Sequence, residues 1–176
     1  MAFTTDAGGL AVKAHIKVST QGSTWNTRLT QLLIRNAEIT ICTFSLPKRG
    51  DFLTKLFDKR SKGVTLIVNS KFRTEATALK ARYPDLRIFL SPDTHAKLAL
   101  AAPDKVWLSS ENLVRSPNFE NTVGIHNVEV YEFYMEQLMR SGLLAPEREL
   151  VAAATASGHY FERGGTKWLN TKTLIP

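Results

Sequence analysis

The sequence predicts an α/β fold, a sandwich in which helices flank both faces of a mixed or parallel central sheet. Three observations support this prediction. Apolar, β-rich segments alternate along the chain with segments of helical periodicity, which is typical of layered α/β proteins. The length of 176 residues favours a single domain, and 43% hydrophobic residues are enough to bury a core. We find neither an internal repeat nor a low-complexity linker.

The first four elements each follow from a local pattern. Residues 10–18 alternate apolar and polar side chains and predict a strand. Residues 23–36 carry apolar residues at helical spacing, with Ser23 as the candidate N-cap. The largely apolar run 38–44 predicts a buried strand. Asp51 is the expected cap of a short helix that ends before Gly63.

The same two periodicities predict the remaining elements. In chain order these are a strand at 64–68, a helix at 74–83, strands at 86–90, 97–101, 105–109 and 122–125, and an amphipathic helix at 128–139. Pro84 stops the helix before it, because proline cannot continue a helical hydrogen-bond ladder. The tight turn Ala102-Pro103-Asp104 joins two of the strands.

The chain divides into two parts on these patterns. Residues 1–141 form the predicted domain, and residues 142–176 form a C-terminal helix and a basic, aromatic tail. Pro146 begins the helix, which is expected to continue through Ala156. The tail beyond it mixes glycine, aromatic and cationic residues, so it could dock on the domain or a partner subunit, or stack on bases. We expect docking.

Composition narrows the class of protein. No run of about 18 apolar residues exists, so we expect no membrane span. The N-terminus lacks the charged start and apolar stretch of a secretory signal. The single cysteine, Cys42, excludes an internal disulfide and fits a reducing cytoplasm. Because Cys42 lies in an apolar run, it is predicted to be a buried core residue rather than a nucleophile.

Positive charge is concentrated in one segment. Residues 48–82 hold ten Lys and Arg against three Asp and Glu, a net charge of +7 by difference. Residues 111–150 hold seven Glu and three Arg. A one-sided basic surface attracts polyanions such as nucleic acid. The same concentration of positive charge is equally well explained by lysines that lie on the solvent-facing sides of helices and bind nothing.

Two short motifs bring together residues that suit phosphate chemistry. His95 and Lys97 stand two apart in a segment expected to be extended, so they should project from the same face. Ser110 follows His95 by fifteen residues, and with Asn112 it can join the pair from a neighbouring strand. The set offers an attacking nitrogen beside a cation. That combination suits a phosphodiester, which needs a nucleophile and neutralisation of its oxygens.

These residues resemble the active-site signature of a known family. His95-x-Lys97, Ser110-x-Asn112 and Glu120-Asn121 look like the signature of the phospholipase D superfamily, and most closely that of its small single-motif (HKD-type) bacterial endonucleases. The resemblance covers about residues 10–140. It includes Gly22-Ser23, the Thr-Phe-Ser segment at 43–45, the Lys-Gly-Val-Thr-Leu-Ile-Val segment at 62–68 and residues 118–125.

The resemblance implies a role for each residue. His95 would attack phosphorus to form a phosphohistidine, while Lys97 and Asn112 bind the phosphate oxygens with help from Ser110. Glu120 would accept a hydrogen bond from the His95 ring and fix its tautomer. A single-motif chain would act as a homodimer, with the second His95 as general acid. No metal or other cofactor is implied, and the remaining histidines show no ligand spacing.

The chain departs from the family pattern at two positions. Ala102 stands where the motif has an aspartate five residues after the lysine, and Ser109 replaces the usual small glycine before the serine. The family's aspartate supports the fold around the site, so its replacement puts turnover in question without removing the nucleophile. Asp104 either substitutes for it structurally or is only a turn residue.

Several of these residues have simpler interpretations. His95 could be an ordinary half-buried histidine, and Lys97 could guard an edge strand against aggregation. Glu120 could cap local backbone N–H groups. Lys71 and Arg73, which follow the strand at 64–68, could reach a bound phosphate as additional substrate-binding residues.

Two classes of function therefore remain open. The first, which we expect, is a metal-independent phosphodiesterase or nuclease that acts on DNA or RNA. The second is a catalytically weak or inactive module that keeps the fold and binds nucleic acid or a protein partner. A phospholipid headgroup transferase is a weaker third option, because the chain has neither an interfacial helix nor room for two motifs.

Overall fold

The structure of the protein, a computed structural model, describes residues 12–19, 37–47, 51–113 and 119–151. Its central sheet has seven strands in the order β1-β7-β6-β5-β2-β3-β4. The strands are β1 (Ala14–Ser19), β2 (Ile39–Thr43), β3 (Val64–Asn69), β4 (Arg87–Ser91), β5 (Leu98–Ala101), β6 (Lys105–Ser109) and β7 (Glu120–His126). The helices are α2 (Asp51–Lys59), α3 (Arg73–Arg82) and α4 (Val128–Arg140), with short 3-10 turns η2 (Ser70–Phe72) and η3 (Pro146–Arg148).

The direction of each strand follows from its connection. β2, β3 and β4 run parallel, and helices α2 and α3 make the crossovers between them. β5 runs antiparallel to β2, and the turn at 102–104 reverses the chain into β6. β7 and β1 continue the antiparallel half. The sheet is therefore mixed, as predicted. The predicted helix at 23–36 lies outside the described residues.

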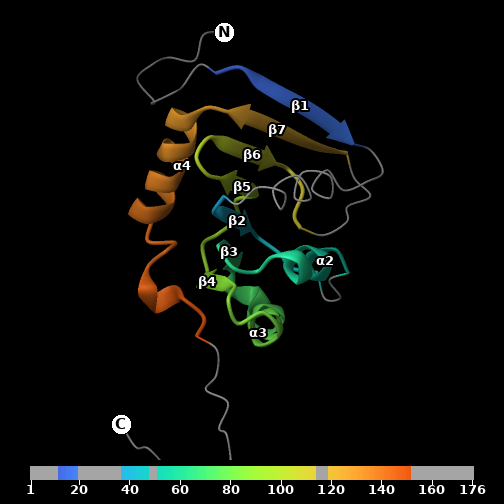
Figure 1. Ribbon diagram of the computed structural model, residues 1–176, viewed down its shortest axis with the longest axis vertical. Helices are drawn as coiled ribbons and strands as arrows, with labels where there is room; N and C mark the ends of the chain where they lie inside the picture. Colours follow the sequence, from blue (N-terminus) through green and yellow to red (C-terminus); the bar gives the residue numbers. More distant parts are fainter. Residues whose placement is uncertain (1–11, 20–36, 48–50, 114–118, 152–176) are drawn as a thin grey trace, which may run out of the picture.

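Helices cover both faces of the sheet, which confirms the predicted α/β sandwich. α2 and α3 lie on one face and α4 lies on the other (Figure 1). Alternate residues of one strand enter different cores because successive side chains point to opposite faces. Ile41 packs in the core under α2 and α3, whereas its neighbour Cys42 packs in the core under α4.

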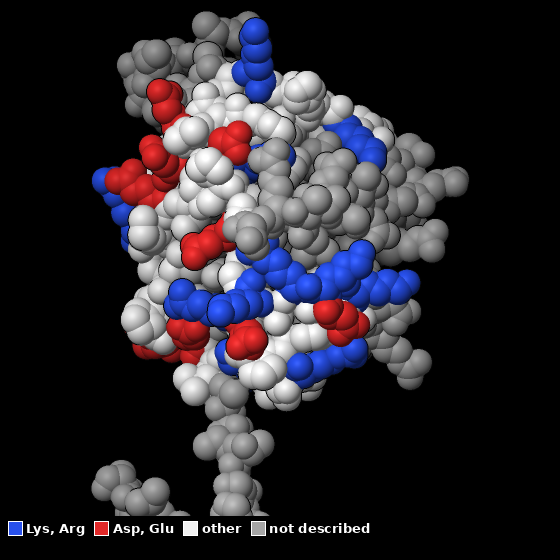
Figure 2. Space-filling model, viewed as in Figure 1, with Lys and Arg blue, Asp and Glu red and all other residues white. Residues whose placement is uncertain are grey.

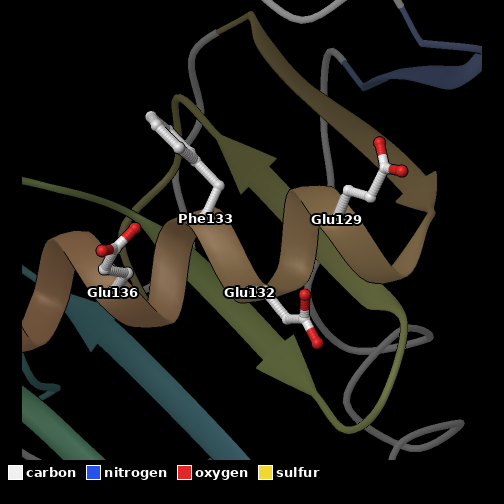
Figure 3. Close-up of a pocket in the computed structure, with 4 residues that line it drawn as sticks. All are labelled: Glu129, Glu132, Phe133 and Glu136. Carbon is white, nitrogen blue, oxygen red and sulfur yellow. The ribbon is translucent and has the colours of Figure 1, made fainter.

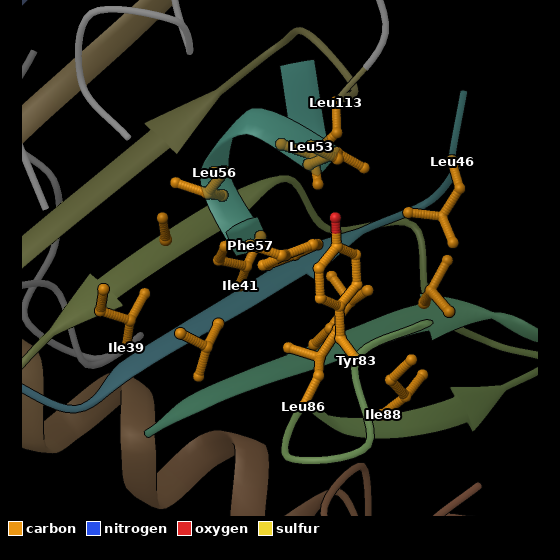
Figure 4. Packing of buried hydrophobic residues seen from close by; sticks show 14 of the residues in the cluster. Ile39, Ile41, Leu46, Leu53, Leu56, Phe57, Tyr83, Leu86, Ile88 and Leu113 are labelled. Carbon is orange, nitrogen blue, oxygen red and sulfur yellow. The ribbon is translucent and has the colours of Figure 1, made fainter. Parts of the chain in front are cut away.

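The core under α2 and α3 is the larger of the two clusters. Leu53, Leu56 and Phe57 of α2 pack with Ile41 and neighbouring strand residues, and Tyr83 belongs to the same cluster (Figure 4). The rings of Phe57 and Tyr83 meet edge to face at a centroid distance of 5.6 Å. This packing fixes the strands whose ends carry the candidate site.

The predicted helix from Pro146 to Ala156 is wrong over its described part. Pro146 begins only one 3-10 turn, after which the chain is extended. The backbone N–H of Leu150 donates to the carbonyl of Ile88 at 2.7 Å, and Arg87 and Glu149 form an ion pair at 2.9 Å. Both partners, the Ile88 carbonyl and the Arg87 side chain, belong to β4 at the outer edge of the sheet. The segment would lose these interactions if it formed a helix. The division of the chain at residue 141 stays a prediction.

None of the described helices combines the length and the apolar composition that crossing a membrane requires.

A surface carboxylate gives the fold a predictable response to acid. The Tyr83 hydroxyl donates to Asp58 at 2.6 Å, and Arg82 lies 3.1 Å from the same oxygen. The Tyr83 hydrogen bond, together with the Arg82 charge, lowers the pKa of Asp58 below its ordinary value. A carboxylate whose pKa is lowered in the folded state stabilises the fold at pH values above its ordinary pKa. This stability is lost as the pH falls through the pKa of the folded state.

We therefore expect Asp58→Asn to lower the melting temperature modestly at about pH 6, with the difference from wild type shrinking below about pH 4. Thermal melts of both proteins across this range would measure it, and a difference independent of pH would contradict it.

Candidate active site

Every residue of the predicted site lies at the same end of the sheet's strands. We call this end the site edge of the sheet, as distinct from its outermost strands β1 and β4. β2 and β3 end at this edge, β5 begins there, β6 ends there and β7 begins there, as the pairs Cys42–Leu98, Leu98–Leu108 and Ser109–Thr122 require. The backbone N–H of Ser109 donates to the carbonyl of Lys97 at 2.9 Å. The two motifs, fifteen residues apart, are therefore joined by the antiparallel pairing of β5 with β6.

His95 and Lys97 lie just before β5 rather than on it. Residues 94–97 have no regular secondary structure, and the strand begins at Leu98, so the expected extension of the strand to Lys97 is wrong by one residue. The two side chains are nevertheless in contact. Lys97 Nζ lies 3.3 Å from Nδ1 of the exposed His95 ring and donates to the His95 carbonyl at 2.9 Å. A cation thus stands directly beside the candidate nucleophile.

Ser110 and Glu120 form the second part of the site. The Ser110 hydroxyl donates a short hydrogen bond to Glu120 Oε2 and accepts one from the backbone N–H of Asn121 at 3.0 Å. Glu120 is 8% exposed, at the first position of β7. The expected bond from the His95 ring to Glu120 does not occur in the described part of the chain, where Glu120 accepts from Ser110 instead. The orienting role of Glu120 stays a prediction.

Asn112 and the departures from the family pattern also have defined places. The Asn112 Oδ1 atom is buried and has no hydrogen-bond donor among the described residues. The Ser109 hydroxyl donates to the Asn121 carbonyl at 3.0 Å and accepts from the Glu111 N–H at 3.0 Å, so it ties the ends of β6 and β7 together, which glycine could not do. Ala102 lies beyond the far end of β5. Its side chain is therefore remote from His95.

Lys71 and Arg73 reach the same edge through a turn fastened to the His95 segment. Both side chains are exposed, at η2 and the start of α3. Asn69, 3% exposed at the end of β3, accepts from the Lys71 N–H at 3.0 Å and donates to the Thr94 carbonyl at 3.0 Å. One asparagine side chain thus links the turn that carries the two cations to the residue before His95.

Sequence reasoning missed an aromatic pair beside His95. The Phe44 and His95 rings have centroids 4.9 Å apart and a tilt of 46°, and Phe72 meets Phe44 edge to face at 5.7 Å. Phe44 stands in the Thr-Phe-Ser segment, directly after β2. The sequence predicts that Phe44 lies at the end of a buried strand. Its contact with His95, 51 positions later, could not be predicted because it depends on the order of the strands in the sheet.

Cys42 is buried beneath the site, as predicted. Its Sγ atom lies 3.7 Å from the Thr94 hydroxyl. Burial raises the pKa of the thiol to about 11, against the opposing effects of the Thr94 hydrogen bond and the nearby Lys97 charge. The thiol is therefore protonated at neutral pH and is not a nucleophile.

The charges on the described surface are unevenly distributed. Basic side chains gather over the half of the molecule that contains α2, α3, β3 and β4, and acidic side chains gather over α4 (Figure 2). A depression on α4 is lined by Glu129, Glu132, Phe133 and Glu136 (Figure 3). Its three carboxylates repel a polyanion. No group of three or more His, Cys, Asp or Glu suited to a metal ion occurs among the described residues.

The fold is a known one, an α/β sandwich built on a mixed seven-stranded sheet. It is the fold of a phospholipase D family member. The chain is similar to Nuc, a phospholipase D family member from Salmonella typhimurium, at 17% identity and a TM-score of 0.51, covering 78% of this chain and 97% of that one. NucT from Helicobacter pylori has 15% identity and a TM-score of 0.56, with coverages of 79% and 99%.

A larger protein shares the same fold. Phosphatidylserine synthase from Haemophilus influenzae has 15% identity and a TM-score of 0.56, but the match of 78% of this chain covers only 39% of the synthase. No protein-family model matches the sequence, and no curated protein matches it. At these identities the likeness establishes the fold alone.

Proposed function

We propose that the protein is a metal-independent phosphodiesterase that cleaves nucleic acid through a phosphohistidine on His95. The observation that carries the proposal is the contact between His95 and Lys97, at the sheet edge that also holds Ser110, Asn112 and Glu120. A nitrogen nucleophile next to a fixed ammonium suits a phosphodiester, because the lysine neutralises the oxygens as the histidine attacks. The likeness of the fold to two proteins named Nuc and NucT supports the same reaction class.

The proposed reaction has two displacements. A ring nitrogen of His95 attacks phosphorus, the bond to the leaving oxygen breaks, and that oxygen takes a proton from His95 of the partner subunit. Water then attacks the phosphohistidine, giving its proton to the partner's His95, and the P–N bond breaks to release the phosphate product. Lys97, with the Asn112 amide and the Ser110 hydroxyl, stabilises the negative charge on the phosphate oxygens in both steps.

The contact of Lys97 with His95 adds a condition to the first step. We take the ammonium as the donor in this contact, which makes Nδ1 the acceptor and places the ring proton on Nε2. Attack requires a ring nitrogen with a free lone pair. When the ammonium moves to a phosphate oxygen it releases Nδ1, which either attacks or takes up the proton so that Nε2 can attack. Substrate binding itself would then activate the nucleophile.

The site requires a second copy of the chain, because one motif supplies one histidine. Exposed apolar side chains beside the site support a homodimer. Phe119, directly before Glu120, is 67% exposed, and Val18, which pairs with Asn121, is 50% exposed. A subunit interface at this edge would cover both side chains and bring the two histidines together.

One observation favours the alternative, a module that binds nucleic acid or a protein without turnover. In the described part of the chain Glu120 bonds to Ser110 and not to His95. Among the described residues, no carboxylate is hydrogen-bonded to the His95 ring to hold its tautomer.

Incubation with labelled DNA and RNA in excess EDTA separates the two functions. We expect wild type to cleave in the chelator, and intact-mass measurement during turnover to find a nucleotide adduct that is absent from His95→Ala. Peptide mapping should place the adduct on His95. Nucleic-acid binding without cleavage or adduct would instead establish the non-catalytic module, and cleavage only with added metal would refute the mechanism.

A further inference from the structure

An aromatic and cationic surface adjoins His95, and the proposed chemistry does not use it. It consists of Phe44, Phe72, Lys71 and Arg73. The His95 ring contacts Phe44 at 4.9 Å between centroids, and Phe44 contacts Phe72 at 5.7 Å. Neither phenylalanine is buried, and Phe72 packs on one side against the core under α2 and α3. The three rings therefore form a continuous row that starts at the candidate nucleophile.

The row has a fixed position relative to His95. Asn69 accepts from the Lys71 N–H at 3.0 Å and donates to the Pro92 and Thr94 carbonyls at 2.9 and 3.0 Å. The asparagine is 3% exposed, so these bonds are shielded from water. They fasten the turn that carries Phe72 to the segment that carries His95. A ligand group on the row would thus be held at a set distance from the reacting phosphate.

The two cations follow the same turn. Lys71 and Arg73 flank Phe72 in the sequence, and both are exposed. Neither of them forms an ion pair with another described residue. Lys71, Phe72 and Arg73 thus alternate cation, aromatic ring and cation. A nucleic-acid strand has a corresponding alternation of phosphates and bases. Rings stack on bases, and cations neutralise phosphates.

We propose that Phe44, Phe72, Lys71 and Arg73 form a subsite for the nucleotide next to the scissile phosphate, and that this subsite selects single-stranded nucleic acid. A base must be unpaired and unstacked from its neighbour to lie against a phenylalanine ring, and the bases of a duplex are not. Phe44 and Phe72 take the base, and Lys71 and Arg73 take the next phosphate. The inference rests on the proposed function for the position of the scissile phosphate.

Equilibrium binding tests the subsite without any cleavage. The probe is a fluorescent 12-nucleotide strand, alone or as a blunt duplex, and every protein carries His95→Asn so that nothing is hydrolysed. Phe44→Leu and Phe72→Leu keep apolar bulk but remove the aromatic face. We expect each to weaken binding of the single strand about 10-fold and to leave duplex binding unchanged. Lys71→Ala and Arg73→Ala should each reduce the slope of log K against log salt by about 0.7.

Phe133→Leu is the matched control, because Phe133 is 39% exposed on α4, among carboxylates. It should change neither affinity. Tighter binding of the duplex than of the single strand, or equal losses on both probes in Phe44→Leu and Phe72→Leu, would overturn the subsite. Melting curves of each variant detect unfolding. Failure of the proposed function would look different, since single-strand binding would persist while wild type formed no adduct and cleaved nothing.

Discussion

Replacement of His95 by alanine is expected to lower the rate of nucleic-acid cleavage by at least about 1000-fold, because it removes the proposed nucleophile. Under the proposed mechanism the loss should appear in kcat, since Lys97, Asn112 and the surrounding cations would still bind the phosphate. His95 is exposed, and among the described residues its side chain makes a ring contact with Phe44 and a polar contact with the Lys97 ammonium. The melting temperature should therefore stay close to that of wild type. Initial rates in EDTA, together with thermal melts, measure both quantities.

His126 provides the matched control for this substitution. It is also an exposed histidine, but it ends β7 and pairs with Lys105, at the opposite edge of the sheet from the site. His126→Ala should keep nearly the full rate. Comparable losses in the two variants would mean that His95 acts only as one more cation, and the phosphohistidine mechanism would then fail.

Most of the fold was predictable because each element carries its own periodicity. The strand at 105–109 is predicted to the residue, and the helix predicted at 128–139 differs from α4 by one residue. In both segments the apolar spacing is unambiguous. The mixed sheet was predictable for a related reason: the turn at 102–104 is too short for a parallel connection, and the helical segments are long enough for one.

Errors arose where a partner distant in sequence decides the local structure. The chain from Pro146 onward has the composition of a helix, yet its described part is one 3-10 turn and an extended segment. The open edge of β4 offers hydrogen bonds to it, and Arg87 offers Glu149 a counter-charge. No pattern within residues 146–151 indicates that the edge of β4 lies beside them.

The positions of the candidate site residues were predictable, but the contacts between them were not. The spacing of His95, Lys97, Ser110 and Asn112 brings them to one sheet edge, where the structure has them. The spacing does not predict which side chains contact one another. In the structure Ser110 donates to Glu120, and the Phe44 ring contacts the His95 ring. Such contacts depend on differences of a few ångströms between loop positions, and sequence spacing does not determine those.

Replacement of Phe57 by alanine is expected to lower the free energy of unfolding by about 3–5 kcal/mol. Phe57 is 2% exposed and lies on α2, where its ring fills the space between the helix and the sheet and meets Tyr83 edge to face. The substitution loses the transfer free energy of the ring and leaves a cavity that the surrounding strands can only partly close. A domain of this size has a total of about 5–15 kcal/mol, so the variant should be folded but marginal. Urea unfolding should show a lower midpoint with an unchanged slope.

Phe133→Ala removes the same ring from α4, where it is 39% exposed, and should change the free energy of unfolding by no more than about 0.5 kcal/mol. The pair of variants therefore separates burial from helix propensity, because both replace phenylalanine by alanine within a helix. A loss in Phe57→Ala as small as that expected for Phe133→Ala would mean that the contacts of α2 with the sheet contribute little, and the strand ends that carry His95 and Phe44 would need another source of rigidity. At temperatures where Phe57→Ala is still folded, it should retain the cleavage rate of wild type, because Phe57 lies in the core under α2 and α3 and not at the strand ends that carry the site.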